Sequence, residues 1–527
     1  MNGIRGRAAP AGAAVLLALA LAAAATAGSS HRAAAAKEGG TLTVGLTAGE
    51  PDALDPTTAR TFSGREVFLT FCEKLYDLNA KAQIVPQLAS ALPTISKDKL
   101  TVTIPLRKGI KFNDGTPFNA DAVVKSIQRD QTLKGSTRAS EISPIDSVSA
   151  SGTSKVVIHL KAPYSPLTAQ FADRAGMIMS PAQLDKLGDK FGTNPVCVGP
   201  FNFDNRVAGD SITLVKSSFY YGKKDVHLDK IVFKVENDAA AAAAALKAGD
   251  LQALDGIDST QLPGIRADKA LRVIKQTSLG YQGVTLNLGN KNGLLKGYSN
   301  VGTPIAANEN LRKAFEMAID RKTMNKVVFG GTVLPGCTPL SPSSVWYDPS
   351  VKCTPYNPTQ AKKLVQASGV SNPTVHLMVP TGTVALRQAQ FMQAEEQAVG
   401  IKVVIDSTDF VTALSKADAG TYDTFQIGWS GRVDPDGNIF QFVNTLGSQN
   451  DSGYTNPRLD LILNNARKAA TQKARQTLYR AAQKIILADR PLIYLYHPVT
   501  RAGLSAKLTG VRMYPDTLTR VAFAAYK

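Results

Sequence analysis

The sequence of 527 residues is poor in the side chains on which most enzyme chemistry depends. It has five histidines, and none stands at a recognisable spacing from an acid or a nucleophile. It also lacks a Gly-x-Ser-x-Gly nucleophile motif, a His-Glu-x-x-His zinc motif and a phosphate-binding glycine loop. We therefore expect no catalytic residues, no cofactor and no enzyme. The rival class is a secreted hydrolase whose catalytic residues lie far apart in the sequence.

Cysteine is also scarce, with four residues at positions Cys72, Cys197, Cys337 and Cys353. No Cys-x2-Cys pair and no nearby histidine are present, so we expect no zinc or other metal site. An even number of cysteines in an exported protein favours disulfides. Cys337 and Cys353 flank a Pro/Ser-rich loop, where a local bridge would limit the freedom of the loop. Cys72 and Cys197 would then pair with each other.

The first residues have the pattern of an export signal. Arg5 and Arg7 precede the apolar stretch Ala11–Ala25, and small-residue cleavage sites end at Ala27 and Ala36. A membrane anchor is disfavoured, because the stretch is short, is dominated by alanine and has no stop-transfer cluster after it. No cysteine precedes Cys72, so the attachment site of a lipoprotein is missing as well. We expect residues 1–36 to be a signal peptide and the mature protein to be soluble and periplasmic or extracellular.

The net charge is strongly positive, but the positive residues are not concentrated in one part of the chain. The formal charge is +18, and loss of Arg5, Arg7 and Arg32 with the signal peptide would leave +15. Lysines are spread along the chain, and neither an arginine-rich run nor a basic patch with interleaved aromatic residues occurs. The pattern indicates distributed solubility charge, and we expect no nucleic-acid partner.

Periodicity in the first half of the chain predicts strands and capped helices. Apolar residues alternate with small or polar residues over Thr41–Leu46 and again over Leu100–Leu106, which is typical of half-buried strands. Asn119 is a plausible N-cap for the helix that follows the second of these strands. The loop Gly289–Asn308 is rich in Gly, Asn and Lys, and we expect the chain to cross between two structural units there.

The second half alternates strands with helices, which predicts an α/β layout. Short strands are expected near the end of the chain. The expected strands are Thr374–Val379, Ile401–Ile405, Thr424–Gly428, Leu492–Tyr496 and Val521–Ala525, and the expected helices include Gln360–Ala367 and Ala385–Val399.

The stretch Gly428–Asn438 concentrates groups able to hold a ligand. It contains Trp429, Arg432, Asp434 and three glycines. Asp-Pro and Asp-Gly are turn dipeptides, and glycine allows close approach of the backbone, so the stretch predicts a tight loop after a strand. Taken alone, it favours the simpler interpretation of a surface turn that carries a half-buried tryptophan.

Several segments together carry a family resemblance. The most specific is Leu106–Val123, and the others, in the same order as in the family, are Gly39–Leu46 with Leu54-Asp55-Pro56, Val198–Phe201, Asn310–Phe315 with Ile319–Arg321, and Asp434-Pro435 followed by Tyr454–Pro457. Over the whole mature chain the sequence resembles the extracytoplasmic solute-binding proteins of ABC importers, in the branch with dipeptide-, oligopeptide-, nickel- and glutathione-binding receptors.

The resemblance implies a two-lobed α/β fold with a large discontinuous first lobe and a second lobe, joined by crossover strands. The implied domains are residues 37–284 for the first lobe, 285–497 for the second and 498–527 for a C-terminal return to the first. It further implies a monomeric, non-catalytic receptor that closes on a short peptide or peptide-like solute and delivers it to a membrane permease. An acidic metabolite, a glycan or a metal chelate is the alternative cargo.

The resemblance also carries over a set of candidate ligand-binding residues, namely Glu50, Pro51, Tyr281, Trp429, Ser430, Gly431, Arg432 and Asp434. In peptide-binding relatives an aspartate three residues after the tryptophan pairs with the amino terminus of the peptide. Arg432 occupies that position here, and Asp434, at the end of a loop one residue shorter, is the candidate substitute for that aspartate. Because a guanidinium repels an ammonium group and attracts a carboxylate, Arg432 either binds an acidic group of the ligand or is neutralised by Asp434 or Asp436.

Overall fold

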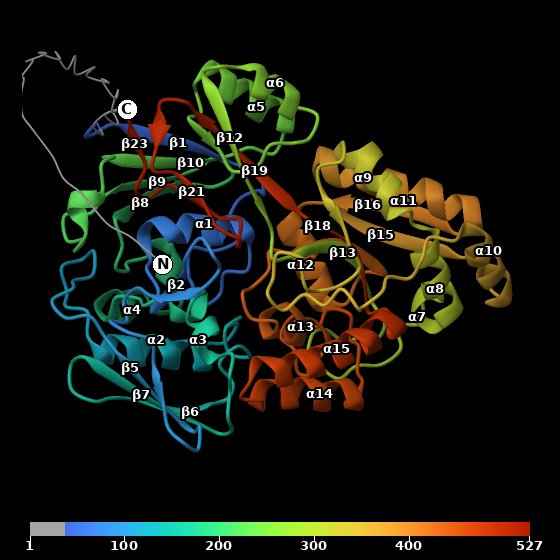
Figure 1. Ribbon diagram of the computed structural model, residues 1–527, viewed down its shortest axis with the longest axis horizontal. Helices are drawn as coiled ribbons and strands as arrows, with labels where there is room; N and C mark the ends of the chain where they lie inside the picture. The colour runs from blue at the N-terminus through green and yellow to red at the C-terminus, as the bar shows by residue number, and fades with distance from the viewer. Residues whose placement is uncertain (1–36) are drawn as a thin grey trace, which may run out of the picture. The chain divides into compact units, whose positions relative to one another are not determined.

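The computed structural model describes residues 37–527 (Figure 1). Their first strand arises from the alternating apolar residues near position 41. The predicted signal peptide lies outside the described residues. The first strand is central in a seven-stranded sheet, in which it pairs in parallel with both neighbours. The order in this sheet is β12 (Leu271–Thr277), β19 (Val499–Ser505), β11 (Ala253–Leu254), β1 (Thr41–Leu46), β10 (Lys230–Val235), β9 (Ser211–Lys216) and β8 (Phe201–Val207).

A second, smaller sheet contains the alternating strand predicted near position 100. Its order is β4 (Thr94–Ile95), β5 (Thr101–Pro105), β7 (Lys155–Leu160) and β6 (Ile145–Ala150). The helix predicted after it is α2 (Ala120–Thr132), and Asn119 caps it by accepting a hydrogen bond from the amide of Ala122 at 3.0 Å. The other helices of this half of the chain are α1 (Phe62–Phe71), α3 (Leu167–Gln170), η1 (Arg174–Gly176), α4 (Pro181–Leu187), η2 (Gly188–Thr193), η3 (Lys223–Asp225), α5 (Ala239–Ala248) and α6 (Leu262–Ala267).

The third sheet has six strands and is covered on both faces. Its order is β14 (Leu334–Pro335), β18 (Leu492–His497), β13 (Tyr281–Leu286), β17 (Thr424–Trp429), β15 (Thr374–Pro380) and β16 (Lys402–Thr408). Along β18, Ile493 and Leu495 join one apolar core while Leu492 and Tyr494 join another, as alternation in a strand requires. The helices are α7 (Pro304–Ala307), α8 (Glu309–Ala318), α9 (Arg321–Phe329), α10 (Pro358–Ala367), α11 (Thr383–Val399), α12 (Phe410–Ala419), α13 (Asp436–Val443), α14 (Pro457–Lys468) and α15 (Gln472–Asp489).

Three short ribbons complete the strands: β2 (Tyr76–Leu78) with β3 (Ile84–Pro86), β20 (Leu508–Thr509) with β23 (Ala525–Tyr526), and β21 (Arg512–Met513) with β22 (Thr519–Arg520). The strand predicted at Val521–Ala525 is therefore wrong. A turn in which the amide of Ala524 donates to the carbonyl of Val521 interrupts it.

Two short segments connect the seven-stranded and six-stranded sheets. The chain leaves β12 at Thr277 and enters β13 at Tyr281, and it returns between β18 and β19. Composition led us to expect the crossing within the loop Gly289–Asn308, but the first crossing lies before this loop. Pairing of β13 with β17 and β18 decides where the six-stranded sheet begins. We call the elements up to β12 and from β19 onward the first lobe, and those from β13 to β18 the second lobe. The domain bounds inferred from the resemblance stay a prediction.

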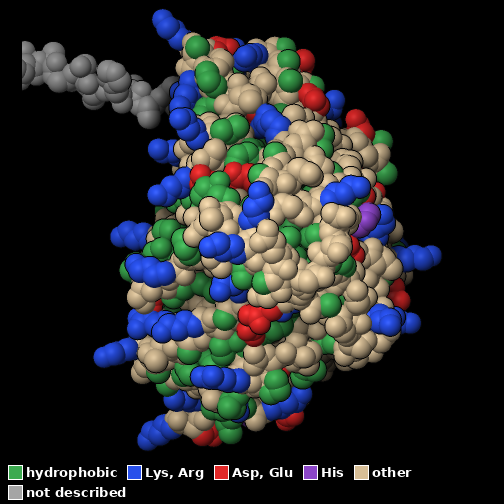
Figure 2. Space-filling model, turned by 90° about the vertical axis from the view of Figure 1, so that its right-hand side faces the viewer, with side chains coloured by type: hydrophobic (Ala, Val, Ile, Leu, Met, Phe, Trp, Pro, Cys, Tyr) green, Lys and Arg blue, Asp and Glu red, His purple; other side chains and the backbone are tan. Residues whose placement is uncertain are grey.

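The surface agrees with the distributed charge expected from the sequence. In Figure 2, Lys and Arg side chains are scattered singly over the face shown, with apolar and acidic groups between them. Within residues 37–527 no helix is both long and apolar enough to cross a membrane.

Both expected disulfides form, one between Cys72 and Cys197 and the other between Cys337 and Cys353. The first joins residues 125 positions apart and lies in the core beside the seven-stranded sheet. Because a bridge across a long loop restricts the unfolded chain most, replacing Cys72 and Cys197 together by alanine should lower the free energy of unfolding by about 2–4 kcal/mol. Urea unfolding of the double variant measures this loss, and the Cys337/Cys353 double variant, which opens a loop of 16 residues, should lose less.

Candidate ligand-binding site

The loop after β17 is held tightly against the first crossing segment. Gly431 has a φ of +81°, and a Cβ added to it would lie 2.4 Å from the amide nitrogen of Gly280. A Cβ on Gly280 would lie 1.8 Å from the carbonyl oxygen of Trp429. Only glycine fits at both positions, so the loop between β17 and α13 packs backbone to backbone on the segment that joins the lobes.

One buried amide side chain fixes the path of this loop. Asn438, in the first turns of α13, accepts hydrogen bonds at Oδ1 from Trp429 Nε1 (3.1 Å) and from the amide of Arg432 (2.7 Å). Its Nδ2 donates to the carbonyl of Arg432 at 2.8 Å. The tight loop expected from the sequence is thus present, and Asn438 orients both its tryptophan and its arginine.

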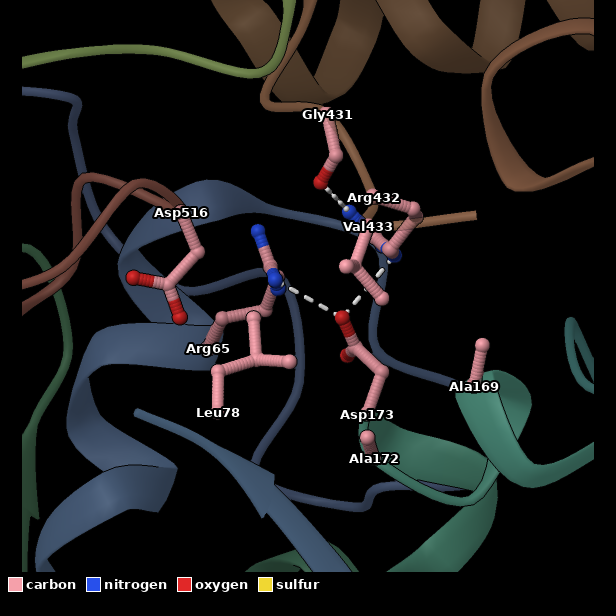
Figure 3. Close-up of a pocket in the computed structure, with 9 residues that line it drawn as sticks. All are labelled: Arg65, Leu78, Ala169, Ala172, Asp173, Gly431, Arg432, Val433 and Asp516. Carbon is pink, nitrogen blue, oxygen red and sulfur yellow. Dashed lines mark hydrogen bonds and ion pairs between the residues drawn. The ribbon is translucent and has the colours of Figure 1, made fainter. Parts of the chain in front are cut away.

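Arg432 forms an ion pair with the first lobe (Figure 3). Its Nε lies 2.8 Å from Oδ2 of Asp173, which caps η1, and Arg65 Nη2 of α1 lies 2.7 Å from the same oxygen. Arg65 Nη1 also donates to Ser430 Oγ at 2.9 Å. Asp173 therefore bridges an arginine of each lobe.

From the sequence we predicted that Arg432 either binds an acidic group of the ligand or is neutralised by Asp434 or Asp436. The second alternative is wrong about the partner, because neither Asp434 nor Asp436 neutralises Arg432. Asp434 binds both terminal nitrogens of Arg475, at 2.7 and 2.6 Å. Asp436 likewise binds Arg467 at 2.7 and 3.0 Å. The helices α14 and α15 thus supply cations of their own, which no spacing in the sequence indicated.

Positive charge exceeds negative charge around Asp173. Arg174 adds a third guanidinium, with Nε 3.5 Å from Asp173 Oδ1. Burial would raise the pKa of Asp173, but Arg432, Arg65 and Arg174 hold that pKa well below its usual range. Burial, together with Arg65, lowers the pKa of Arg432 to about 9, although Asp173 opposes the shift. One carboxylate does not neutralise three buried guanidinium groups.

A small cavity opens among these groups, and it is lined by Arg65, Leu78, Ala169, Ala172, Asp173, Gly431, Arg432, Val433 and Asp516. Its volume is about 10 Å³, which is room for about one water molecule. Three buried nitrogens, Arg65 Nε, Arg174 Nε and Arg432 Nη2, have no hydrogen-bond partner among the described residues. Asp516 also faces the cavity, but both of its oxygens are bound by Arg520. The cluster therefore has free donors and excess positive charge, which suits an anion.

A second cavity is lined by the end of β17, just before the same loop. It measures about 30 Å³ and includes Tyr281, Gly428 and Trp429 in its lining. Trp429 contacts a residue of each cavity: the guanidinium of Arg432 lies 4.1 Å from its ring centroid, and the ring centroid of Phe442 lies 4.9 Å from it.

The candidate residues from the sequence thus divide into three groups. Gly431 and Arg432 line the first cavity, with Ser430 hydrogen-bonded at its edge, and Tyr281 and Trp429 line the second. Asp434 is bound to Arg475 and lines neither cavity. Glu50 accepts hydrogen bonds from Arg206 at 2.8 and 2.6 Å, and the carbonyl of Pro51 accepts one at 2.9 Å, so this pair also lies outside both cavities. No contact here tests their ligand roles, which stay predictions.

Sequence reasoning missed Arg65 and Asp173. Arg65 lies in α1 and is 5% exposed, and Asp173 precedes a three-residue helix and is 7% exposed. Neither belongs to a motif. A charged residue within an apolar helical stretch is the only available signal for Arg65, and nothing in the sequence pairs it with position 432.

Two lobes joined by two short crossing segments, with buried charged groups meeting between them, define a solute-binding protein of the periplasmic-binding type. The model of the bacterial extracellular solute-binding proteins, family 5, matches residues 83–451. The chain belongs to this family.

Relatives agree over nearly the full length. The chain is 30% identical over 484 residues to the glutathione-binding protein GsiB of Pectobacterium atrosepticum, covering 88% of this chain and 90% of the relative. Among solved structures, the periplasmic binding protein DppA from Helicobacter pylori in complex with the peptide STSA superposes with a TM-score of 0.84 at 23% identity, covering 93% and 98% of the two chains. A dipeptide-binding protein from Pseudoalteromonas sp. SM9913 in complex with Met-Leu gives 0.84 at 21% identity, covering 93% and 100%. The fold predicted from the sequence is confirmed.

Proposed function

We propose that this protein is an exported, non-catalytic receptor of an ABC importer that binds a short peptide or peptide-like solute between its lobes. The name of the GsiB relative, and the peptides bound in the two structural neighbours, support this class of cargo. The lack of catalytic motifs in the sequence supports a receptor rather than the rival hydrolase. A membrane permease would be the partner, and the protein would act as a monomer in the periplasm or outside the cell.

The observation that carries the proposal is the excess of guanidinium groups around Asp173. Arg65 comes from the first lobe and Arg432 from the second, and both line the first cavity, so an anion bound between them would hold the lobes together. A ligand carboxylate would accept hydrogen bonds from Arg65 Nε and Arg432 Nη2, whose residues line the cavity, and would reduce the cost of burying like charges. We therefore assign the acidic end of the ligand to this cluster, with Ser430 and Gly431 as neighbouring contacts.

Binding would couple to lobe closure. The first cavity has room for about one water molecule, so a peptide enters only when the lobes separate. The two crossing segments, at residues 278–280 and 498, are the natural hinge. A ligand that contacts Arg65 and Arg432 together has higher affinity for the closed arrangement, and that difference drives closure.

Native mass spectrometry of the protein purified from its own host tests the proposal. We expect one molecule of a small peptide-like compound with at least one acidic group per protein chain. A bound acidic metabolite without a peptide bond would support the alternative cargo. A bound dipeptide with a free amine and no acidic group would contradict the role of the arginine cluster. Turnover of the bound compound to a product would favour the hydrolase.

A further inference from the structure

Three aromatic rings outside the candidate ligand site are exposed on the first lobe. Phe219, Tyr221 and Phe523 are 42%, 43% and 44% exposed. The buried Tyr220 connects two of them, because its ring centroid lies 4.7 Å from that of Tyr221 and 6.4 Å from that of Phe523. The rings come from the segment after β9 and from the turn before β23, which are remote in the sequence. We call these three exposed rings the aromatic patch.

Two cations lie over rings of the aromatic patch. Lys111 Nζ is 5.9 Å from the ring centroid of Phe219, and the guanidinium carbon of Arg107 is 5.8 Å from that of Tyr221. Both cations belong to the loop that follows β5. Phe219 also contacts this loop, since a Cβ added to Gly115 would lie 3.1 Å from Phe219 Cζ. Cations and aromatic rings therefore share one exposed surface.

A buried carboxyl group holds the tyrosines of this surface in place. The hydroxyl of Tyr220 donates to Glu73 Oε1 at 2.7 Å, and the hydroxyl of Tyr221 donates to Glu73 Oε2 at 2.9 Å. Glu73 is 6% exposed, so it fixes the rings from the inner side without facing solvent. A surface whose side chains are already fixed loses less conformational entropy when it binds a partner.

The charge next to the aromatic patch is positive. Segments 107–115 and 219–225 carry five cations against two carboxylates, and both oxygens of one carboxylate, Asp114, are already bound by Thr116 and Ser180. Four of the five cations are lysines, which are depleted in protein–protein interfaces but are attracted to anionic lipid headgroups. The composition therefore favours a lipid surface over a protein partner. The five cations, all exposed, are Arg107, Lys108, Lys111, Lys223 and Lys224.

We propose that the aromatic patch and these five cations bind the surface of an anionic membrane. The rings enter the boundary between headgroups and acyl chains, and the lysine and arginine side chains pair with lipid phosphates. Binding is reversible, because only a few side chains reach the bilayer. A receptor held in this way searches for its permease in two dimensions, whichever solute it carries. The inference goes beyond the proposed function and does not depend on the identity of the cargo.

Co-sedimentation of the purified protein with lipid vesicles tests this surface. One set of vesicles contains phosphatidylcholine alone, and the other contains an equal amount of phosphatidylglycerol. We expect about tenfold or stronger partitioning to the anionic vesicles, lost at high salt because salt screens the charges. Arg107→Gln combined with Lys111→Gln should lower the partition coefficient about tenfold. Phe219→Ser combined with Phe523→Ser should lower it about fivefold, because less apolar surface leaves water.

Matched variants in the second lobe provide the controls. Lys363→Gln with Arg458→Gln removes two exposed cations from α10 and α14, and Tyr347→Ser with Tyr356→Ser removes two exposed rings. Both control variants should bind the anionic vesicles as wild type does, and thermal unfolding shows whether each variant is folded. Equal binding of wild type to both kinds of vesicle, or equal losses in patch and control variants, would overturn the proposal. Unchanged lipid binding in both patch variants would also overturn it and would favour a protein as the occupant.

Discussion

Replacing Arg432 with glutamine should weaken binding of the co-purified solute by about 2–5 kcal/mol, which is a loss of roughly 30-fold or more. The substitution removes the only second-lobe cation that reaches Asp173 among the described residues. A ligand carboxylate would then contact first-lobe arginines alone and would no longer favour closure. Isothermal titration calorimetry of the refolded, ligand-free protein measures the change.

A matched substitution distinguishes this effect from a general loss of positive charge. Arg480→Gln removes a half-exposed guanidinium on α15 that pairs with Asp348, and it should leave the affinity unchanged. The fold of the Arg432 variant should survive, because Asp173 keeps its ion pair with Arg65. An affinity equal to that of wild type in Arg432→Gln would remove the ligand role of this residue.

Asp434→Ala should destabilise the protein by about 3–5 kcal/mol, because it leaves Arg475 as a buried charge without its partner. Both oxygens of Asp434 are bound by Arg475, and Arg475 is 5% exposed. Urea unfolding followed by circular dichroism gives the free energy of unfolding. The expected result identifies Asp434 as a structural anchor of the loop and not as a substitute for the missing amine-binding aspartate.

A double variant tests the physical reason. Asp434→Leu combined with Arg475→Met replaces the ion pair by apolar side chains of similar size, and it should recover most of the lost stability. Asp348→Ala, at the more exposed pair with Arg480, should cost less than about 1 kcal/mol. If Asp434→Ala costs no more than this surface control but lowers the affinity, Asp434 belongs to the ligand site.

Local patterns in the chain were sufficient for most of the fold. Alternation located β1 and β5, the side chain of Asn119 located the start of α2, and the order of strands and helices after position 310 indicated an α/β lobe. These features depend on residues within a few positions of one another, so they can be predicted directly from the sequence. The crossing point was misplaced because it depends on which strands pair, and β13 pairs with partners more than a hundred residues away.

The same distinction between local and long-range determinants applies to the candidate site. By itself the sequence determined that a tight loop with Trp429 and Arg432 follows a strand, since glycine and turn residues impose this locally. Only the tertiary structure decided the charges around that loop, because Asp173 and Arg475 come from segments remote from it in the sequence. Electrostatic energy depends on distance in space and on burial, neither of which is encoded in spacing along the chain.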